Sequence, residues 1–407
     1  MSRRPQGRRA FLKTMAAGAL ASGSALAGVL GQAPRDPGRS GGNGMAYRRL
    51  GRTGLSVSEI SLGSSPLPDP DLLREIIDRG VNYLDTSHNY ENGNAERQIG
   101  RLLRDAGRDK VFVATKFHVE PRDTPDTIAA SVHGSLRRLA VETIDVLMIH
   151  GAESASVLVD ERVLEAYERL KKEGAYRFRG LSCHANQAEV VGKAVDCGLY
   201  DMVQVGYNVF DIQEPAGEVE TYPDYLGTSG LRGLIEKAHA KGVGVVAMKT
   251  LKVGGRRQDL TKYRTGTASI YQAMLKWVLD DAGVTTALIE ISNRREMEED
   301  LGAAGTKLRA AERAALARLV RENGADYCHG CAACRRACPA GVATTDILRA
   351  LAYAESYGKR DRARAVLASL AESEKAGACR DCGACKKACP YGVAVRRRVR
   401  YARRLLA

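Results

Sequence analysis

The stretch VNYLDTSHNYENGNAE, residues 81–96, combines a short apolar run with a polar turn. Val81–Leu84 predicts a strand that ends on Asp85, the turn carries Tyr90, and a helix is expected to begin near Asn94. A carboxylate and a phenol five residues apart, just past the carboxyl end of a strand, indicate a site in an α/β protein. The structural alternative is an aspartate that caps a helix beside a half-buried tyrosine.

Apolar strands alternate with amphipathic helices from Tyr47 onward. The run YRRLGRTGLSVSEISLG predicts a small hairpin leading into the first strand. The eight predicted strands are Glu59–Leu62, Val81–Asp85, Val111–Lys116, Ile144–His150, Phe178–Ser182, Met202–Tyr207, Val243–Lys249 and Thr285–Ile291. The helices are predicted at Asp71–Asp78, Ala95–Arg104, Thr127–Leu139, Arg162–Lys172, Gln187–Cys197, Gly230–Lys241, Ser269–Leu279 and Arg295–Ala303. Strict alternation favours an α/β fold, a (β/α)8 TIM barrel with its site at the carboxyl ends of the strands.

Three consecutive strands end on or near titratable residues. The second strand ends on Asp85 with Tyr90 just beyond it, the third on Lys116 in VFVATKF, and the fourth on His150 in IDVLMIH. Isolated buried charges are costly, so packing alone does not explain this clustering. The segments YRRLGRTGLSVS, LDTSHNY and ATK, together with the strand-four histidine, resemble the aldo/keto reductase family over about residues 47–308. The resemblance implies that Asp85, Tyr90, Lys116 and His150 form a catalytic tetrad.

These residue types suit carbonyl reduction, the reaction that the resemblance implies. A phenol has a pKa near 10, and a neighbouring ammonium such as Lys116 is expected to lower it. Asp85 would orient Lys116, and Tyr90 would protonate the carbonyl oxygen as hydride arrives. His150 would hydrogen-bond the same oxygen. The resemblance thus implies an oxidoreductase that transfers hydride between NADPH or NADH and a carbonyl or alcohol substrate.

The resemblance also implies cofactor-binding positions. Ser182 and Gln204 match the residues that hold the nicotinamide carboxamide, whereas Cys183 stands where many members have Asn and Met248 or Lys249 where an aromatic ring often stacks. The loop after the eighth strand resembles the adenine-nucleotide loop, with phosphate held at a helix start. Glu296 aligns with the usual arginine for the 2′-phosphate. The residues implied in this loop are Ser292, Asn293, Arg294, Arg295, Glu299 and Asp300. A solvated first helical turn is the alternative.

The first residues have the composition of a targeting segment. Arg8-Arg9 precedes an Ala/Gly-rich apolar run that ends in Ala25-Leu26-Ala27, an A-x-A type of cleavage site. This order resembles a twin-arginine export signal over residues 1–27 and implies export by the twin-arginine machinery to a periplasmic or extracytoplasmic location. The location is cytoplasmic if the signal is not used. Residues 28–46, rich in Gly, Pro and Ser, are expected to form a flexible linker.

Eight cysteines fall into two repeated motifs, which we name the first and second cysteine motifs. Their spacing is C-x2-C-x2-C-x3-C-P in both. The first contains Cys328, Cys331, Cys334 and Cys338, and the second contains Cys379, Cys382, Cys385 and Cys389. This spacing predicts two 4Fe-4S clusters; disulfides and zinc ribbons are alternatives that fit it poorly. Resemblance to two-cluster ferredoxins implies that the fourth cysteine of each motif ligates the other cluster.

The segment between the motifs predicts two helices, Asp346–Tyr357 and Arg360–Ala371, so residues 309–407 are expected to form a small, mostly α-helical ferredoxin-type domain. Of the formal charge of +14, residues 328–407 supply +11, from 17 basic and six acidic residues. Two oxidised clusters offset part of this charge, and the remainder favours either an acidic redox partner protein or a solvated surface. The basic tail from Arg396 to Arg404 lacks interleaved aromatic residues apart from Tyr401, which argues against nucleic-acid binding.

Two functional hypotheses follow. The first is an aldo/keto reductase type of enzyme with a fused electron-transfer domain. The second is an exported iron–sulfur electron-transfer protein whose barrel is a non-catalytic scaffold or binding module. The mismatch between two-electron hydride transfer and one-electron clusters favours the second, as do the departures at Cys183, Met248, Lys249 and Glu296. The intact tetrad favours the first, which is the function that we predict.

Overall fold

The computed structural model describes residues 44–184, 186–212, 230–251, 260–355 and 358–405. The predicted export signal at residues 1–27 and nearly all of the predicted linker lie outside the described residues. Among the residues that are described, no helix has the length and apolar character needed to cross a membrane.

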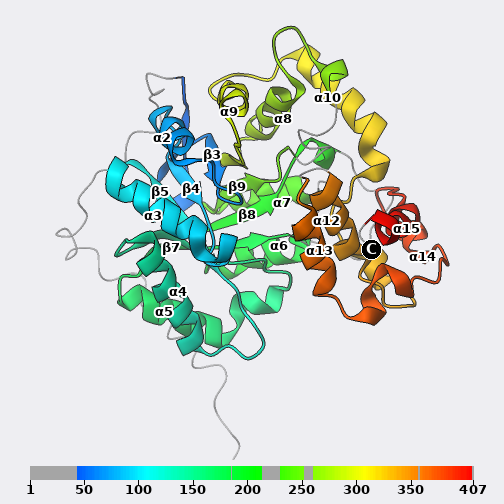
Figure 1. Ribbon diagram of the computed structural model, residues 1–407, viewed down its shortest axis with the longest axis horizontal. Helices are drawn as coiled ribbons and strands as arrows, with labels where there is room; N and C mark the ends of the chain where they lie inside the picture. Colours follow the sequence, from blue (N-terminus) through cyan, green and yellow to red (C-terminus); the bar gives the residue numbers. More distant parts are fainter. Residues whose placement is uncertain (1–43, 185, 213–229, 252–259, 356–357, 406–407) are drawn as a thin grey trace, which may run out of the picture. The chain divides into compact units, whose positions relative to one another are not determined.

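Eight parallel strands close into a barrel, with helices lying around them (Figure 1). The strand order is β10-β3-β4-β5-β6-β7-β8-β9, and the first and last strands close the barrel by pairing Ala287 with Ile60 and Ile289 with Leu62. The barrel strands are β3 (Ile60–Gly63), β4 (Tyr83–Asp85), β5 (Phe112–Phe117), β6 (Ile144–Ile149), β7 (Tyr176–Cys183), β8 (Met202–Gly206), β9 (Gly244–Met248) and β10 (Thr286–Ile289). The predicted (β/α)8 fold is therefore confirmed.

The barrel helices follow the strands in the predicted order. They are α2 (Pro70–Asp78), α3 (Asn94–Ala106), α4 (Pro125–Leu139), α5 (Glu161–Lys172), α6 (Gln187–Cys197), α7 (Gly230–Ala240), α8 (Ile270–Leu279) and α9 (Arg294–Leu301). Local sequence sets their starts: Asp69 accepts hydrogen bonds from two backbone amides of α2, and Thr124 and Ser269 begin α4 and α8 with capping boxes. Apolar side chains of the helices pack against the outside of the strands.

A hairpin of β1 (Tyr47–Arg49) and β2 (Ser56–Ser58) closes the amino-terminal end of the barrel. Leu50, Leu55 and Val57 belong to the apolar cluster inside the barrel. Gly51, with φ +49°, lies so close to the backbone before β9 that a Cβ atom would be 2.3 Å from the Gly244 nitrogen. Because this end is plugged, only the carboxyl end of the barrel is available for a site.

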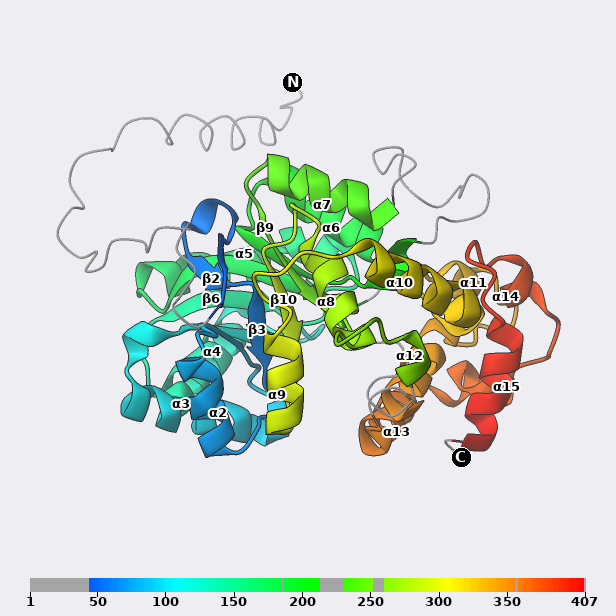
Figure 2. The same ribbon diagram turned by 90° about the horizontal axis from the view of Figure 1, so that it is seen from above.

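The chain leaves the barrel through α10 (Ala310–Asn323), which packs against α8 (Figure 2). A buried ion pair joins the Lys276 Nζ atom of α8 to the Glu312 Oε1 atom of α10 at 2.9 Å. The sequence boundary at residues 308/309 places α10 with the iron–sulfur domain, whereas its Leu316, Leu319 and Val320 pack on the barrel side. The apolar face of α10 thus extends the barrel by one helix.

Five helices follow α10 and surround a separate small core that includes the cysteine motifs. They are α11 (Ala333–Arg336), α12 (Thr344–Glu355), α13 (Arg360–Ala368), α14 (Ala384–Lys387) and α15 (Val395–Leu405). The predicted spacer helices correspond to α12 and α13, and the basic tail forms α15. Three of its arginines pair with acidic residues of the same region, namely Arg396 with Asp381, Arg397 with Asp326 and Arg398 with Glu355.

Candidate active site at the carboxyl end of the barrel

Strand pairing brings the predicted catalytic residues together. β4 pairs with β5, and β5 pairs with β6, so the ends of these three strands meet at one edge of the barrel. The Lys116 Nζ atom lies 2.6 Å from the Asp85 Oδ1 atom and donates to the Thr86 carbonyl oxygen at 2.7 Å. The side chains of Lys116 and Asp85 are only 1% and 3% exposed, so they form a buried ion pair.

Tyr90 and His150 face each other beside this ion pair. The Lys116 Nζ atom lies 5.0 Å from the centre of the Tyr90 ring, and the rings of Tyr90 and His150 meet edge to face with centres 5.6 Å apart. The His150 Nδ1 atom contacts the Ser87 hydroxyl at 3.0 Å, which orients the imidazole. The four residues predicted as a tetrad are therefore one cluster.

Burial decides the protonation of this cluster. It raises the pKa of Tyr90 above the usual value for a phenol, and Asp85 adds to this, while Lys116 and Arg362 act in the opposite direction without prevailing. Lys116 lowers the pKa of Tyr90, as we expected, but burial outweighs the ammonium and the net shift is upward. Burial also raises the pKa of Asp85, and it lowers the pKa of His150 well below 6.5, so that imidazole is neutral at pH 7.

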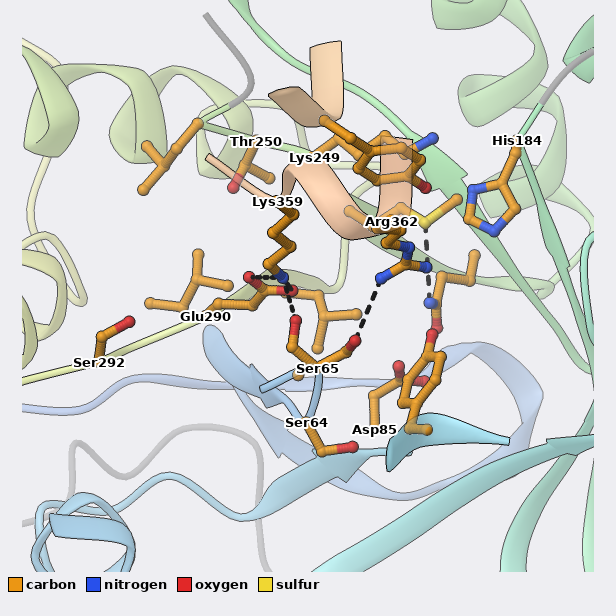
Figure 3. A pocket seen from close by; sticks show the side chains of 18 of the residues that line it. Ser64, Ser65, Asp85, His184, Lys249, Thr250, Glu290, Ser292, Lys359 and Arg362 are labelled. Atoms are coloured by element: carbon orange, nitrogen blue, oxygen red, sulfur yellow. Dashed lines mark hydrogen bonds and ion pairs between the residues drawn. The ribbon is translucent and has the colours of Figure 1, made fainter. Parts of the chain in front are cut away.

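A cavity of about 420 Å³ opens above the cluster (Figure 3). Asp85 and Tyr90 lie at its base, and the ends of β3, β8, β9 and β10 supply further lining residues. Its volume is within the range of small-molecule sites, about 300–1,000 Å³. After β7 the cavity is lined by His184, whereas Cys183 is buried in the core between the barrel and its helices. Cys183 therefore does not take the cofactor-contacting place of the family's Asn.

The part of the chain that contains the two cysteine motifs and helices α11 to α15, which we call the iron–sulfur region, supplies the roof of this cavity. Lys359 and Arg362 of the α12–α13 region line it together with Tyr353 of α12. Lys359 pairs with the Glu290 carboxylate at 2.6 Å, and Arg362 donates to the Ser65 hydroxyl at 3.1 Å (Figure 3). The sequence does not predict a role for these three residues in the cavity. The periodicity that predicted α12 and α13 says nothing about which barrel residues they contact.

Two residues predicted to hold a carboxamide have different surroundings. Gln204 lines the cavity; its Nε2 atom contacts the Met248 sulfur at 3.8 Å, and its buried Oε1 atom has no hydrogen-bond partner among the described residues. An amide N–H donor of a ligand would satisfy this oxygen, so Gln204 fits a carboxamide. Ser182 is fully buried and already bonded to the Gly151 amide at 3.1 Å.

Three of the four predicted phosphate-binding residues in the loop after β10 already form hydrogen bonds or ion pairs with other protein groups. The Ser292 amide donates to Glu296 at 2.8 Å, Asn293 caps α9, and Arg294 pairs with Glu75 at 2.8 Å. Arg295 is exposed. A phosphate at the Ser292 amide would therefore displace a carboxylate. The two predicted adenine-side residues differ, since Glu299 is partly exposed and Asp300 is fully buried.

Cysteines of the two motifs lie close enough to act on one another electrostatically. Burial raises the pKa of Cys331 to about 12, and the neighbouring thiols that add to it are Cys328, Cys334 and Cys389. The pKa of Cys385 is raised first by burial and then by the neighbouring thiols Cys334, Cys379 and Cys338. Each fourth cysteine is thus close to the other motif, the arrangement that two 4Fe-4S cubes require. Among the described residues no three ligand side chains converge on a point suitable for a single metal ion.

Comparison with known proteins agrees with this division of the chain. Residues 70–267 match the aldo/keto reductase family, and residues 327–395 match a 4Fe-4S dicluster domain. The chain therefore contains an aldo/keto reductase domain followed by an iron–sulfur dicluster domain. It is an oxidoreductase of the aldo/keto reductase type.

Individual relatives cover the barrel. L-galactose dehydrogenase of Arabidopsis thaliana is 26% identical over 293 residues, which is 63% of this chain and 87% of that protein. The solved holo aldo-keto reductase of Bacillus halodurans is 24% identical, with a TM-score of 0.53 over 68% of this chain and 96% of its own. One from Klebsiella pneumoniae, solved in complex with NADPH, is 23% identical, with a TM-score of 0.53 over 67% and 94% of the two chains. At these identities the solved structures show a shared fold.

Proposed function

We propose that this protein transfers hydride between a nicotinamide dinucleotide and a carbonyl or alcohol substrate in the cavity above Tyr90. The observation that carries the proposal is the buried Asp85–Lys116 pair, 2.6 Å apart, set beside the Tyr90 ring with the edge-to-face His150. A scaffold would have no need of two buried charges and a phenol at an open cavity, because such groups are costly to bury.

In the proposed mechanism Tyr90 is the general acid of carbonyl reduction. Its raised pKa keeps the phenol protonated, and it gives its proton to the carbonyl oxygen as negative charge develops there. Lys116, bonded to Asp85, stabilises the phenolate that remains. Neutral His150 donates from Nε2 to the same carbonyl oxygen, which requires that its Nδ1 atom accept from the Ser87 hydroxyl, in place of the bond that this hydroxyl donates to the Asn89 Oδ1 atom at 2.9 Å.

Gln204 would hold the carboxamide of the nicotinamide through its buried Oε1 atom, which otherwise lacks a partner among the described residues. The cofactor would supply the hydride when bound; the Klebsiella pneumoniae structure that shares the fold was solved in complex with NADPH. We also assign the clusters: Cys328, Cys331, Cys334 and Cys389 hold one, and Cys379, Cys382, Cys385 and Cys338 hold the other. Each of the two proposed 4Fe-4S clusters would exchange one electron at a time with a redox partner protein.

One observation favours the second candidate, an electron-transfer protein with a non-catalytic barrel. Glu296 occupies the Ser292 amide, and its carboxylate lies where the family's arginine for a 2′-phosphate aligns. Binding of a dinucleotide at this loop must then displace or tolerate a negative charge. An anaerobic titration with NADPH and NADH separates the candidates: a scaffold leaves nicotinamide fluorescence and cluster absorbance unchanged, and a coupled enzyme changes both.

The test of the mechanism is Tyr90→Phe in the full chain with both clusters. We expect carbonyl reduction to fall by at least about 100-fold, the scale of a general acid's contribution, while iron content is unchanged. Tyr401→Phe, a tyrosine of α15 far from the cavity in sequence, is the matched control and should retain wild-type turnover. Equal turnover by Tyr90→Phe and wild type would contradict the mechanism.

We further propose that the protein is exported by the twin-arginine machinery, supported by Arg8-Arg9 and the apolar run that follows. Replacing both arginines with lysine should retain the precursor in the cytoplasm, as detected by cell fractionation; unchanged export would refute the proposal.

An acidic redox partner is supported by exposed cations that form no ion pair among the described residues: Arg380, Lys386, Lys387, Arg403 and Arg404. The rate of electron transfer between the clusters and this acidic partner protein should fall steeply with added salt.

A further inference from the structure

Arg362 of α13 reaches from the iron–sulfur region to the catalytic tyrosine of the barrel. Its guanidinium carbon lies 5.9 Å from the centre of the Tyr90 ring and 4.7 Å from that of Tyr353, and it shares a side-chain hydrogen bond with Tyr90. Its Nη1 atom donates to the Ser65 hydroxyl at 3.1 Å. Arg362 is therefore a cation at the reacting end of the cavity, although it lies 272 positions from Tyr90 in the sequence.

The charged residues that line the cavity are Lys249, Lys359, Arg362, Asp85, Glu290 and Glu296, and Glu290 acts on Arg362 without forming an ion pair with it. Lys359 is neutralised by Glu290 at 2.6 Å, and Lys116 below the cavity is neutralised by Asp85 at 2.6 Å. No carboxylate forms an ion pair with Arg362 within the part of the chain that the structure describes. A guanidinium carries five N–H donors, and the contacts with Ser65 and Tyr90 use only some of them. A largely buried cation without an ion-pair partner is a ready site for an anionic group.

We propose that Arg362 binds the carboxylate of an oxo acid, so that the substrate is a carbonyl compound with a carboxylate on the same or the next carbon. This inference rests on the proposed carbonyl reduction at Tyr90. The Tyr90 oxygen accepts from Arg362 and Lys116, which leaves its own proton for the substrate carbonyl. In that pose the carbonyl oxygen and the guanidinium are both neighbours of one phenol oxygen.

This proximity selects a carboxylate rather than a more distant anion. A phosphate ester separates its phosphorus from the carbonyl carbon by at least one carbon and one oxygen, so its anion lies farther from the carbonyl than a carboxylate on the same or the next carbon does. A carboxylate also matches the planar fork of a guanidinium, with two parallel hydrogen bonds. The iron–sulfur region would then contribute substrate specificity to the barrel in addition to its electron-transfer role.

The test compares a 2-oxo acid with its neutral methyl ester on the full chain with both clusters. The variant is Arg362→Gln, the conservative variant is Arg362→Lys, and the matched control is Arg364→Gln on the same helix, where Arg364 is 59% exposed and pairs with Asp361. We expect Arg362→Gln to lower kcat/KM for the acid about 10- to 100-fold, the range for losing charge-assisted hydrogen bonds, and to change the ester less than about threefold. Arg362→Lys should restore part of the preference for the acid, and Arg364→Gln should match wild type.

A second readout does not depend on turnover. Calorimetric binding of oxamate, a carboxylate that is not reduced, should weaken by a similar factor in Arg362→Gln. Equal losses for acid and ester would show that Arg362 only braces the roof, and a wild-type preference for the ester would overturn the oxo-acid assignment while leaving the proposed reduction intact. If neither compound is reduced, the proposed function fails; oxamate binding that does not respond to Arg362→Gln would then overturn the anion site as well.

Discussion

Replacing Lys116 by methionine removes one member of a buried ion pair. Its ammonium is 2.6 Å from the Asp85 carboxylate, and both side chains are almost inaccessible. Methionine has a similar length, so the main loss is the charge. Removing one partner of a buried pair costs about 3–5 kcal/mol, because the other charge is left buried. We therefore expect the free energy of unfolding of Lys116→Met to fall by that amount at pH 8.

The pH dependence of this loss provides a sharper test. Burial already raises the pKa of Asp85, and Lys116 lowers it, so the variant raises it further. A carboxyl whose folded pKa lies above its unfolded value contributes less stability as pH rises. If Asp85 is protonated in the folded variant and ionised in the unfolded chain, stability falls by about 1.4 kcal/mol per pH unit. The difference from wild type should thus shrink between pH 8 and pH 6.

Trp277 makes this measurement direct. It is the only tryptophan of the chain and lies on α8 of the barrel, with its ring 5.1 Å from that of Tyr207. Anaerobic urea unfolding followed by its fluorescence reports on the barrel. Lys262→Met, which breaks an exposed pair with Glu322, is the control and should cost less than about 1 kcal/mol. A loss below about 1 kcal/mol for Lys116→Met, or a loss that grows as pH falls, would refute the reasoning.

Three further predictions address the clusters, the nucleotide and the histidine. Cys389→Ser should halve the iron content and leave the first three thiols of the first cysteine motif open to alkylation, as measured by peptide mass spectrometry. Cys338→Ser should in the same way expose the first three thiols of the second cysteine motif. Alkylation of the thiols in the motif that carries the mutation would exclude crossed ligation. Glu296→Gln should tighten NADPH relative to NADH by about tenfold, because a carboxylate repels the 2′-phosphate, and Glu298→Gln should not change this ratio of Kd values. Because the pKa of His150 lies well below 6.5, kcat/KM for carbonyl reduction should stay level from pH 8 to pH 6.5; an inflection near pH 7 that disappears in His150→Gln would contradict this.

The barrel was predictable because each strand and helix carries its own signal. The helix predicted at Gln187–Cys197 has those bounds in the structure, since an apolar face recurs at helical spacing between polar turns. The strand at Val81–Asp85 is shorter than predicted. Its start is displaced because Asn82 hydrogen-bonds the backbone of Ser56 and Ser58 instead of continuing the strand. The hydrophobic periodicity of the sequence does not reveal where a side chain, here that of Asn82, competes with the strand for backbone hydrogen bonds.

The tetrad was predictable for the same local reason, whereas the roof of the cavity was not. Asp85, Lys116 and His150 stand at strand ends, and parallel pairing must bring such ends together. Arg362 and Lys359 meet the barrel only because the iron–sulfur helices dock there, and a basic residue on an amphipathic helix is ordinarily solvated. The net pKa of Tyr90 was likewise hidden, since residue types reveal a neighbouring ammonium but not the depth of burial that outweighs it.

Helix α12 connects a predicted cluster ligand with the cavity above Tyr90. The Thr344 hydroxyl at its start donates to the Cys334 sulfur at 3.1 Å, and Tyr353 near its end lines the cavity. Nine residues of helix span about 14 Å, so one helix connects a predicted cluster ligand with the cavity. If a cluster fixes Cys334, it also fixes the start of this helix and, through the helix, the part of the cavity that Tyr353 lines. Cluster assembly and the shape of the cavity would then be coupled within one chain.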